Sequence, residues 1–115
     1  MVSFAALKIK LSIMQKYSIK PLSNIARIGL EKLEGTSCSL EENSKTPDGV
    51  LVRSTKMTSK DLTPNLKAIS RAGAGVNNIP IEKCTEEGIV VFNTPGANAN
   101  AVKELVLAGL MLSSR

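Results

Sequence analysis

The sequence LKAISRAGAGVNNIPIEKCTEEGIVVFNTPGANAN, residues 66–100, decides the fold of this chain. It holds two short apolar runs, at 66–70 and 89–92, and a loop rich in Gly, Asn or Thr follows each of them. The residues directly after the runs are Arg71 and Asn93, which apolar packing would not select. In an open parallel sheet a ligand lies beyond the carboxyl ends of the strands. We therefore expect two buried strands here and a functional site in the loops that follow them.

Outward from this stretch, strand-like and helix-like segments alternate along the chain. Pro80 near the start and Gly88 at the end of 79–88 are typical of the two ends of a helix. Asn98 or Asn100 is expected to cap a final, strongly apolar helix. The alternation predicts an α/β fold with a mostly parallel sheet flanked by helices. The other predicted elements are strands at 17–19, 36–40 and 50–52, a helix capped by Ser23 and ended by Gly35, a loop at 41–49 and a helical turn at 61–65.

Composition limits what such a domain can do. The chain has 115 residues, of which 43% are hydrophobic and 22% charged, as in one small globular domain. Aromatic residues make up only 3%, so the core must be aliphatic. The net charge of +5 comes from scattered basic residues without stacking aromatics, so no nucleic-acid partner is expected. Cys38 and Cys84 lack metal-ligand spacing and the chain has no His, which removes the basis for a zinc, haem or Cys–His site.

No apolar run approaches the roughly 20 residues that cross a bilayer, and the start of the chain lacks the pattern of a signal peptide. A cytoplasmic protein without a membrane partner is therefore expected. Residues 1–13 are interpreted as an N-terminal extension ahead of Met14; an edge strand or a targeting tail are the alternatives.

The glycine loop at 72–78 resembles a dinucleotide-binding fingerprint but does not match it. After Gly73 and Gly75, the third glycine position holds Asn78, and Asn93 stands where an acidic residue is required. Glycines still allow consecutive backbone N–H groups to turn towards an anion. The loop is therefore either a tight turn or an anion cradle.

Two arginines favour the anion cradle. Arg53 and Arg71 each follow an apolar strand, so both are expected at the same edge of the sheet. A guanidinium carries a fixed fork of donors that suits carboxylate and phosphate groups. Asn93, Thr94 and Asn98 would add amides and a hydroxyl, although capping explains Asn98 nearly as well.

Residues 69–110, ISRAGAGVNNIPIEKCTEEGIVVFNTPGANANAVKELVLAGL, strongly resemble the substrate-domain segment of the D-3-phosphoglycerate dehydrogenases, within the D-isomer-specific 2-hydroxyacid dehydrogenases. VLVRS at 50–54 fits the same family. The resemblance is specific over 50–112 and looser over 14–49. It implies a flavodoxin-like substrate domain that is incomplete without its C-terminal part, with 14–100 in that domain and 101–115 starting the helix that leads into an NAD-binding domain.

The resemblance further implies NAD-dependent oxidation of 3-phospho-D-glycerate to 3-phosphohydroxypyruvate, the first step of serine biosynthesis, in a cytoplasmic homo-oligomer. Asn77 departs from the Asp that is common in the family at this position. The residues that match the family's substrate contacts are Arg53 with Ser54, Arg71, the backbone of Gly73, Ala74, Gly75 and Val76, and Asn98.

The family's catalytic His, its partner Glu, a further Arg and the nucleotide loop have no counterpart in this chain. No catalytic residue is therefore expected here, and the chain alone is predicted to be inactive. One alternative is another D-2-hydroxyacid dehydrogenase, such as one acting on erythronate 4-phosphate. A second is a non-catalytic module that associates with another subunit through the apolar last helix.

Overall fold

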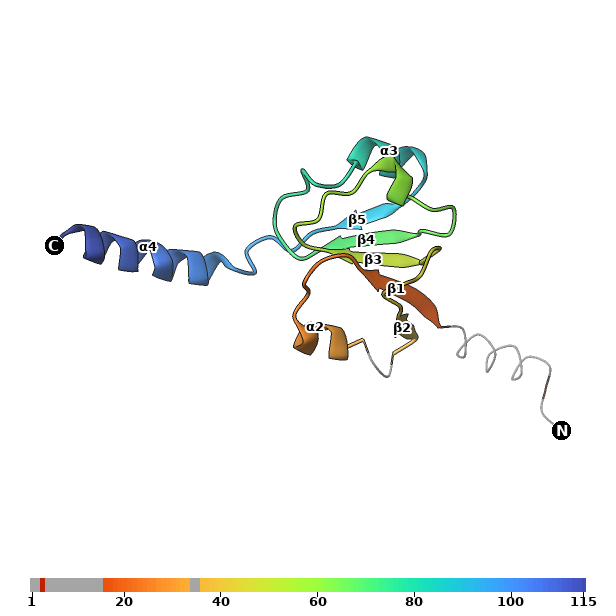
Figure 1. Cartoon of the computed structure of the whole chain (residues 1–115), viewed down its shortest axis with the longest axis horizontal. Coiled ribbons are helices and arrows are strands. Elements are labelled where there is room, and N and C mark those ends of the chain that lie inside the picture. The colour runs from red at the N-terminus through yellow and green to blue at the C-terminus, as the bar shows by residue number, and fades with distance from the viewer. Residues whose placement is uncertain (1–2, 4–15, 34–35) are drawn as a thin grey trace.

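A computed structural model describes residues 3, 16–33 and 36–115 and shows an α/β domain with one projecting helix (Figure 1). The five strands are all parallel, in the order β2-β1-β3-β4-β5, which confirms the predicted fold class. This is the strand order of flavodoxin-like folds. The predicted extension at 1–13 and the predicted stop at Gly35 lie outside the described residues, Ser3 excepted. The elements are β1 (Tyr17–Pro21), α2 (Arg27–Glu31), β2 (Cys38–Leu40), β3 (Gly49–Val52), the 3-10 turn η1 (Ser59–Asp61), β4 (Ala68–Arg71), α3 (Ile81–Glu86), β5 (Val90–Phe92) and α4 (Ala99–Ser113).

The first helix is much shorter than predicted. Among the described residues between β1 and β2, only α2 is an α-helix; it buries none of its residues, and Ile28 is 74% exposed. Ser23 does not cap this helix, because Ala26 occupies the cap position without a side-chain bond. Instead, the Ser23 hydroxyl accepts hydrogen bonds from two backbone N–H groups of the loop after β3. The predicted cap was therefore wrong, because a tertiary contact competes for the same oxygen.

The other helix boundaries follow the predictions more closely. Pro80 stands at the N-cap of α3, and Gly88 ends the segment with φ +70, a conformation that favours glycine. Asn98 stands at the N-cap of α4, but its side chain makes no capping hydrogen bond. The predicted helical turn at 61–65 lies earlier, as η1.

Among the described residues, the core lies on one face of the sheet and consists of aliphatic and sulfur-containing side chains. Val50, Val52 and Ile69 point to this face, and Val52 and Ile69 are completely buried. The opposite face is less covered, because Val90 and Phe92 alternate with Val91 and are more than half exposed. The remaining core residues, which come from the loops, from α3 and from the residue before β5, are Met57, Leu66, Ile79, Cys84 and Ile89.

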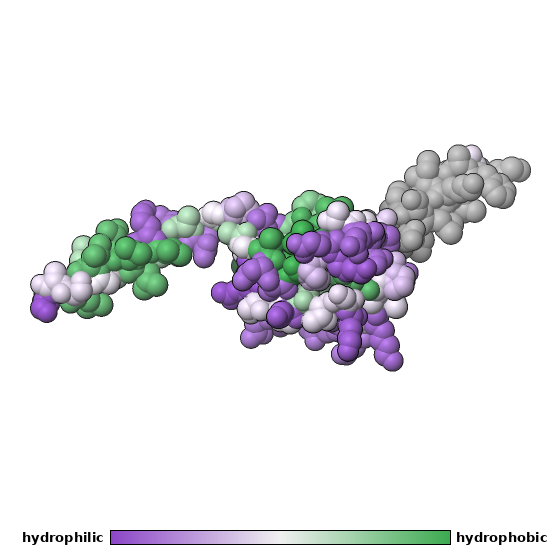
Figure 2. All heavy atoms as spheres, turned by 90° about the horizontal axis from the view of Figure 1, so that it is seen from above, coloured by the Kyte–Doolittle hydropathy of each residue, from purple (hydrophilic) through white to green (hydrophobic). Residues whose placement is uncertain are grey.

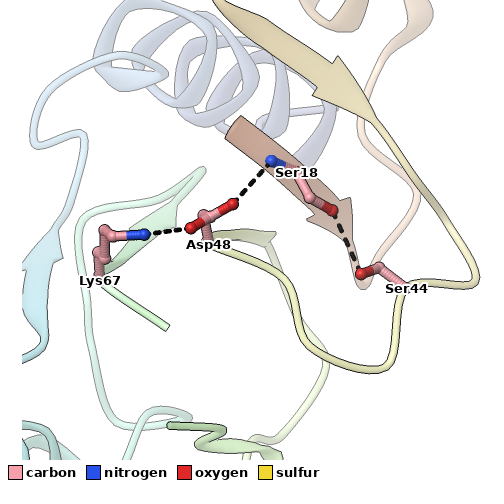
Figure 3. A network of polar contacts seen from close by, with 4 residues as sticks. All are labelled: Ser18, Ser44, Asp48 and Lys67. Atoms are coloured by element: carbon pink, nitrogen blue, oxygen red, sulfur yellow. Dashed lines mark hydrogen bonds and ion pairs between the residues drawn. The ribbon is translucent and has the colours of Figure 1, made fainter. Parts of the chain in front are cut away.

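Polar contacts tie the amino ends of three neighbouring strands together (Figure 3). The Asp48 carboxylate, just before β3, accepts a hydrogen bond of 3.0 Å from the backbone N–H of Ser18 and pairs with the Lys67 ammonium, just before β4. The Ser18 hydroxyl donates to Ser44 at 3.2 Å. These bonds lower the pKa of Asp48, first through Lys67 and then through the Ser18 N–H. The network aligns one end of the sheet, opposite to the predicted site.

Helix α4 extends away from the domain (Figure 1). Figure 2 shows apolar side chains at the surface over much of this helix. Leu105, Leu112 and Met111 are at least 70% exposed. In the part of the chain that the structure describes, no helix combines the length and the apolar character needed to cross a bilayer.

Candidate functional site

Three predicted site residues meet at the carboxyl edge of the sheet. Arg53 follows β3, Gly73 lies in the loop after β4, and Asn98 precedes α4. They line one hollow of about 270 Å³, together with Ala72, Thr94 and Ala97. The parallel order of β3, β4 and β5 brings these loops together, as expected for a ligand site in an open sheet.

Arg53 is the free cation of this hollow. Its residue is exposed, and its guanidinium forms no hydrogen bond or ion pair with any described residue. A guanidinium without a protein partner keeps all its donors for an anion. Arg53 is therefore able to bind a carboxylate or phosphate group in this hollow.

The sequence predicts Arg71 as a second cation for a ligand, but its guanidinium donates hydrogen bonds within the protein. Its Nε donates to the Arg53 carbonyl at 3.1 Å, and its Nη1 donates to the Gly75 carbonyl. An added Cβ at Gly73 would lie 3.0 Å from Nη1, so a side chain there would displace the guanidinium. The guanidinium thus packs under the glycine loop, and its direct contact with a ligand stays a prediction.

The glycine loop is held by its carbonyls, while several of its amides remain available. The Ala74 carbonyl accepts a hydrogen bond of 2.7 Å from Asn93 Nδ2, and the Gly75 carbonyl accepts from Arg71. The N–H of Gly73 donates to the Arg71 carbonyl at 3.0 Å within the turn. The N–H groups of Ala74, Gly75 and Val76 donate no hydrogen bond to any part of the chain that the structure describes. They remain candidates for anion donors, although the residues of this loop that line the hollow are Ala72 and Gly73.

Thr94 joins the loop after β5 to the glycine loop. Its N–H donates to the Gly73 carbonyl at 3.0 Å and its hydroxyl to the Arg71 carbonyl at 3.3 Å. Asn98, in contrast, lines the hollow with a side chain that does not cap α4. Its amide is therefore free to contact a ligand, while Thr94 is structural.

Ser54 does not line the hollow of Arg53. It lines a larger hollow of about 690 Å³, formed by the loops that follow β1, β2 and β3 together with Pro21 of β1 and Leu30 of α2. The predicted pair of Arg53 and Ser54 is thus divided between two neighbouring hollows.

Two residues in the site had not been predicted to act there. Ser23 and Asn78 both make side-chain hydrogen bonds to the backbone of residues 53–55. The sequence pattern indicated a helix cap for Ser23 and a failed glycine position for Asn78. Only the pairing of β1, β3 and β4 brings them to the same loop.

The chemistry of the site is that of binding. Its polar groups are a guanidinium, backbone amides, side-chain amides and hydroxyls, which hold an anion by donating hydrogen bonds. Cys84 lies in the core, where burial raises the pKa of its thiol. Across the described residues, His, Cys, Asp and Glu side chains form no group that would hold a metal ion.

Comparison with known families agrees with this geometry. Residues 9–109 match the model of the D-isomer specific 2-hydroxyacid dehydrogenase catalytic domain. The chain belongs to this family. The match covers β1 to β5 and most of α4, including every loop that lines the hollow.

Individual relatives in the family carry more than one enzyme name. A hydroxypyruvate reductase from Thermotoga maritima is 44% identical over 91 residues, which are 72% of this chain and 29% of that protein. A D-3-phosphoglycerate dehydrogenase from Methanocaldococcus jannaschii is 39% identical over 104 residues, which are 84% of this chain and 19% of that protein. The chain therefore spans less than a third of the length of these family members.

A solved structure shares the fold. The NAD+-bound 3-phosphoglycerate dehydrogenase of Entamoeba histolytica aligns with a TM-score of 0.67 and 31% identity, over 81% of this chain and 37% of that one.

Proposed function

We propose that this chain forms part of the substrate site of a D-2-hydroxyacid dehydrogenase that oxidises 3-phospho-D-glycerate to 3-phosphohydroxypyruvate with NAD. The observation that carries the proposal is the unpartnered guanidinium of Arg53, in a hollow shared with Gly73 and Asn98. The names of relatives support the choice of substrate but also include a hydroxypyruvate reductase. The phosphorylated acid is preferred because a site with a free guanidinium and free amides suits a ligand with several negative charges.

Each group has a distinct part in binding. Arg53 holds an anionic group of the substrate through its fork of donors, and Asn98 donates or accepts through its amide. The free N–H groups of the glycine loop hold a second anionic group, as backbone donors do in other anion sites. Arg71 holds the Gly75 carbonyl of this loop and the Arg53 carbonyl of the loop after β3. A direct contact of Arg71 with substrate, as the family resemblance implies, belongs to the same proposal.

The described residues do not fit NAD itself. The glycine loop has Asn78 in place of the third glycine, and the Arg71 guanidinium packs against Gly73, where a pyrophosphate would need to approach the backbone. The chain also has no His to act as a base. We propose that another part of the complete enzyme binds NAD and supplies the catalytic base, and that the chain alone is inactive.

The proposal is tested by titrating the ¹⁵N-labelled chain with 3-phosphoglycerate and following the backbone amides by NMR. Saturable shifts are expected at Gly73, Gly75 and Arg53. Arg53→Ala should shift this titration to much higher ligand concentrations, while Arg27→Ala, which removes an exposed arginine paired with Glu31, should leave it unchanged. Equal shifts with Arg53→Ala would contradict the proposal. Glycerate, hydroxypyruvate and erythronate 4-phosphate distinguish the candidate substrates in the same assay.

A second role in subunit association is supported by α4. Apolar side chains of this helix, including Leu105 and Leu107, are exposed along its length. We propose that they pack against another domain or subunit of the complete, homo-oligomeric enzyme. If so, the chain should bind a purified D-3-phosphoglycerate dehydrogenase in analytical ultracentrifugation, and Leu105→Glu should prevent it. A chain that stays monomeric with and without that enzyme would exclude this role.

A further inference from the structure

A single hydroxyl group accepts hydrogen bonds from two backbone N–H groups of the loop that carries Arg53. Ser23 Oγ accepts hydrogen bonds from the backbone N–H of Arg53 at 3.0 Å and of Thr55 at 3.3 Å. The same hydroxyl donates to Thr55 Oγ1 at 3.0 Å, and Thr55 Oγ1 donates to the Leu22 carbonyl at 2.7 Å. A hydroxyl has one donor and two acceptor sites, so that of Ser23 is fully used.

One amide holds the carbonyls of the same two residues. Asn78 Nδ2 donates to the Arg53 carbonyl at 3.2 Å and to the Thr55 carbonyl at 2.8 Å. Arg71 Nε adds a further bond to the Arg53 carbonyl. The backbone N–H and carbonyl groups of Arg53 and Thr55 are therefore all bound by side chains from the loops after β1 and β4.

The direction of the Asn78 amide is determined by these contacts. Its Nδ2 faces two carbonyl oxygens, which only a donor can satisfy. Its Oδ1 is buried and has no hydrogen-bond partner among the described residues. An unpaired buried acceptor is unfavourable, so the contacts of Nδ2 have to compensate for it. A carboxylate at this position would place an oxygen against both carbonyls and break the contact.

We propose that Ser23 and Asn78 are positioning residues that fix residues 53–55 and thereby aim the Arg53 guanidinium into the 270 Å³ hollow. This inference rests on the proposed role of Arg53 in binding the anionic substrate. It assigns Ser23 and Asn78 no contact with the ligand. They act by orienting the Arg53 side chain before the ligand arrives. Less conformational entropy of this side chain is then lost on binding.

The test uses isosteric changes in the 115-residue chain and the dissociation constant of 3-phosphoglycerate, measured by NMR. Asn78→Asp is expected to raise the dissociation constant roughly five- to tenfold, which is the size of effect typical of residues that contact each other. Ser23→Ala should act in the same direction, and Ser23→Thr should restore binding because it keeps the hydroxyl. Asn77→Asp is the matched control: it adds the same charge one residue away, where the side chain forms no hydrogen bond within the described chain.

A double-mutant cycle with Arg53→Ala separates positioning from a general loss of structure. If Asn78 acts through Arg53, Asn78→Asp should have little further effect once the guanidinium is absent. Full additivity, or equal weakening by Asn77→Asp, would overturn the inference. The loop itself is followed through hydrogen exchange of the Arg53 and Thr55 amides, which should accelerate in Asn78→Asp.

The two proposals fail in different ways. If Arg53→Ala does not weaken binding, the proposed site is wrong. If Arg53→Ala weakens binding but Asn78→Asp and Ser23→Ala do not, the site stands and the positioning role is wrong.

Discussion

The ion pair at the amino ends of β1, β3 and β4 gives a quantitative prediction for stability. Asp48→Asn keeps the size of the side chain and an oxygen that can accept from the Ser18 N–H, but removes the charge that pairs with Lys67. The Lys67 side chain is 62% exposed and that of Asp48 is 25% exposed, so solvent screens much of the attraction. We expect the free energy of unfolding at pH 7 to fall by about 1 kcal/mol for Asp48→Asn, and by about 2 kcal/mol for Asp48→Ala, which also loses the bond to Ser18.

The pH dependence follows from the lowered pKa of Asp48. Because the folded protein holds the carboxylate more strongly than the unfolded chain does, this stabilisation is present above the unfolded pKa, near 3.8. It is lost as the pH falls through the lower, folded pKa. The difference between the original chain and Asp48→Asn should therefore be constant from pH 7 to about pH 5 and should shrink below the unfolded pKa.

The assay is urea denaturation followed by far-UV circular dichroism, at several pH values and at low and high salt. High salt should reduce the difference, because the pair is partly exposed. Glu31→Gln serves as control, since it breaks an exposed helical pair with Arg27 that is worth no more than about 0.5 kcal/mol. A difference between the original chain and Asp48→Asn that stays the same down to pH 3, or that is absent at pH 7, would refute the reasoning.

Three further substitutions or reagents test other parts of the structure. Gly73→Ala would place a methyl group 3.0 Å from Arg71 Nη1. It should lower the free energy of unfolding in urea titration by about 1 kcal/mol and weaken the binding of 3-phosphoglycerate in ligand titration. Unchanged values of both would mean that the guanidinium moves aside freely. Ile69→Ala empties a completely buried position in the core and should lower the free energy of unfolding by about 2 to 5 kcal/mol in urea denaturation, whereas a loss below that range would indicate a loosely packed core. Cys84, whose thiol pKa is raised by burial, should react with a thiol reagent in the folded chain far more slowly than the less buried Cys38; equal rates would contradict the packing of α3 on the sheet.

Local sequence signals predicted the architecture well where they were strong. Apolar runs ended by polar loops located β3, β4 and β5, and Pro80 and Gly88 bounded α3. These signals work because strand burial and helix ends depend on neighbouring residues. The first helix was overestimated because Ile28, spaced for a buried helical face, lies in a helix that packs against little of the domain.

The sequence also predicted which residues meet at this edge of the sheet, but not the hydrogen bonds that they form. Residues at the ends of parallel strands converge whenever the sheet forms, so Arg53, Gly73 and Asn98 were expected at one edge and line one hollow. The direction of a long side chain is set by partners that are remote in sequence. Arg71 therefore braces the carbonyls of residues 53 and 75 while Arg53 remains free, a distinction that two arginines at strand ends do not reveal.

The sequence by itself determined the parallel α/β fold, the aliphatic core, the family and the edge of the sheet at which Arg53, Gly73 and Asn98 meet. The tertiary structure alone decided which cation is free, and it alone brought Ser23 and Asn78 to the loop of Arg53. The physical reason is the range of the interactions. Burial periodicity and helix ends are encoded within about ten residues, whereas the hydrogen bonds that aim Arg53 join loops 30 and 25 residues apart.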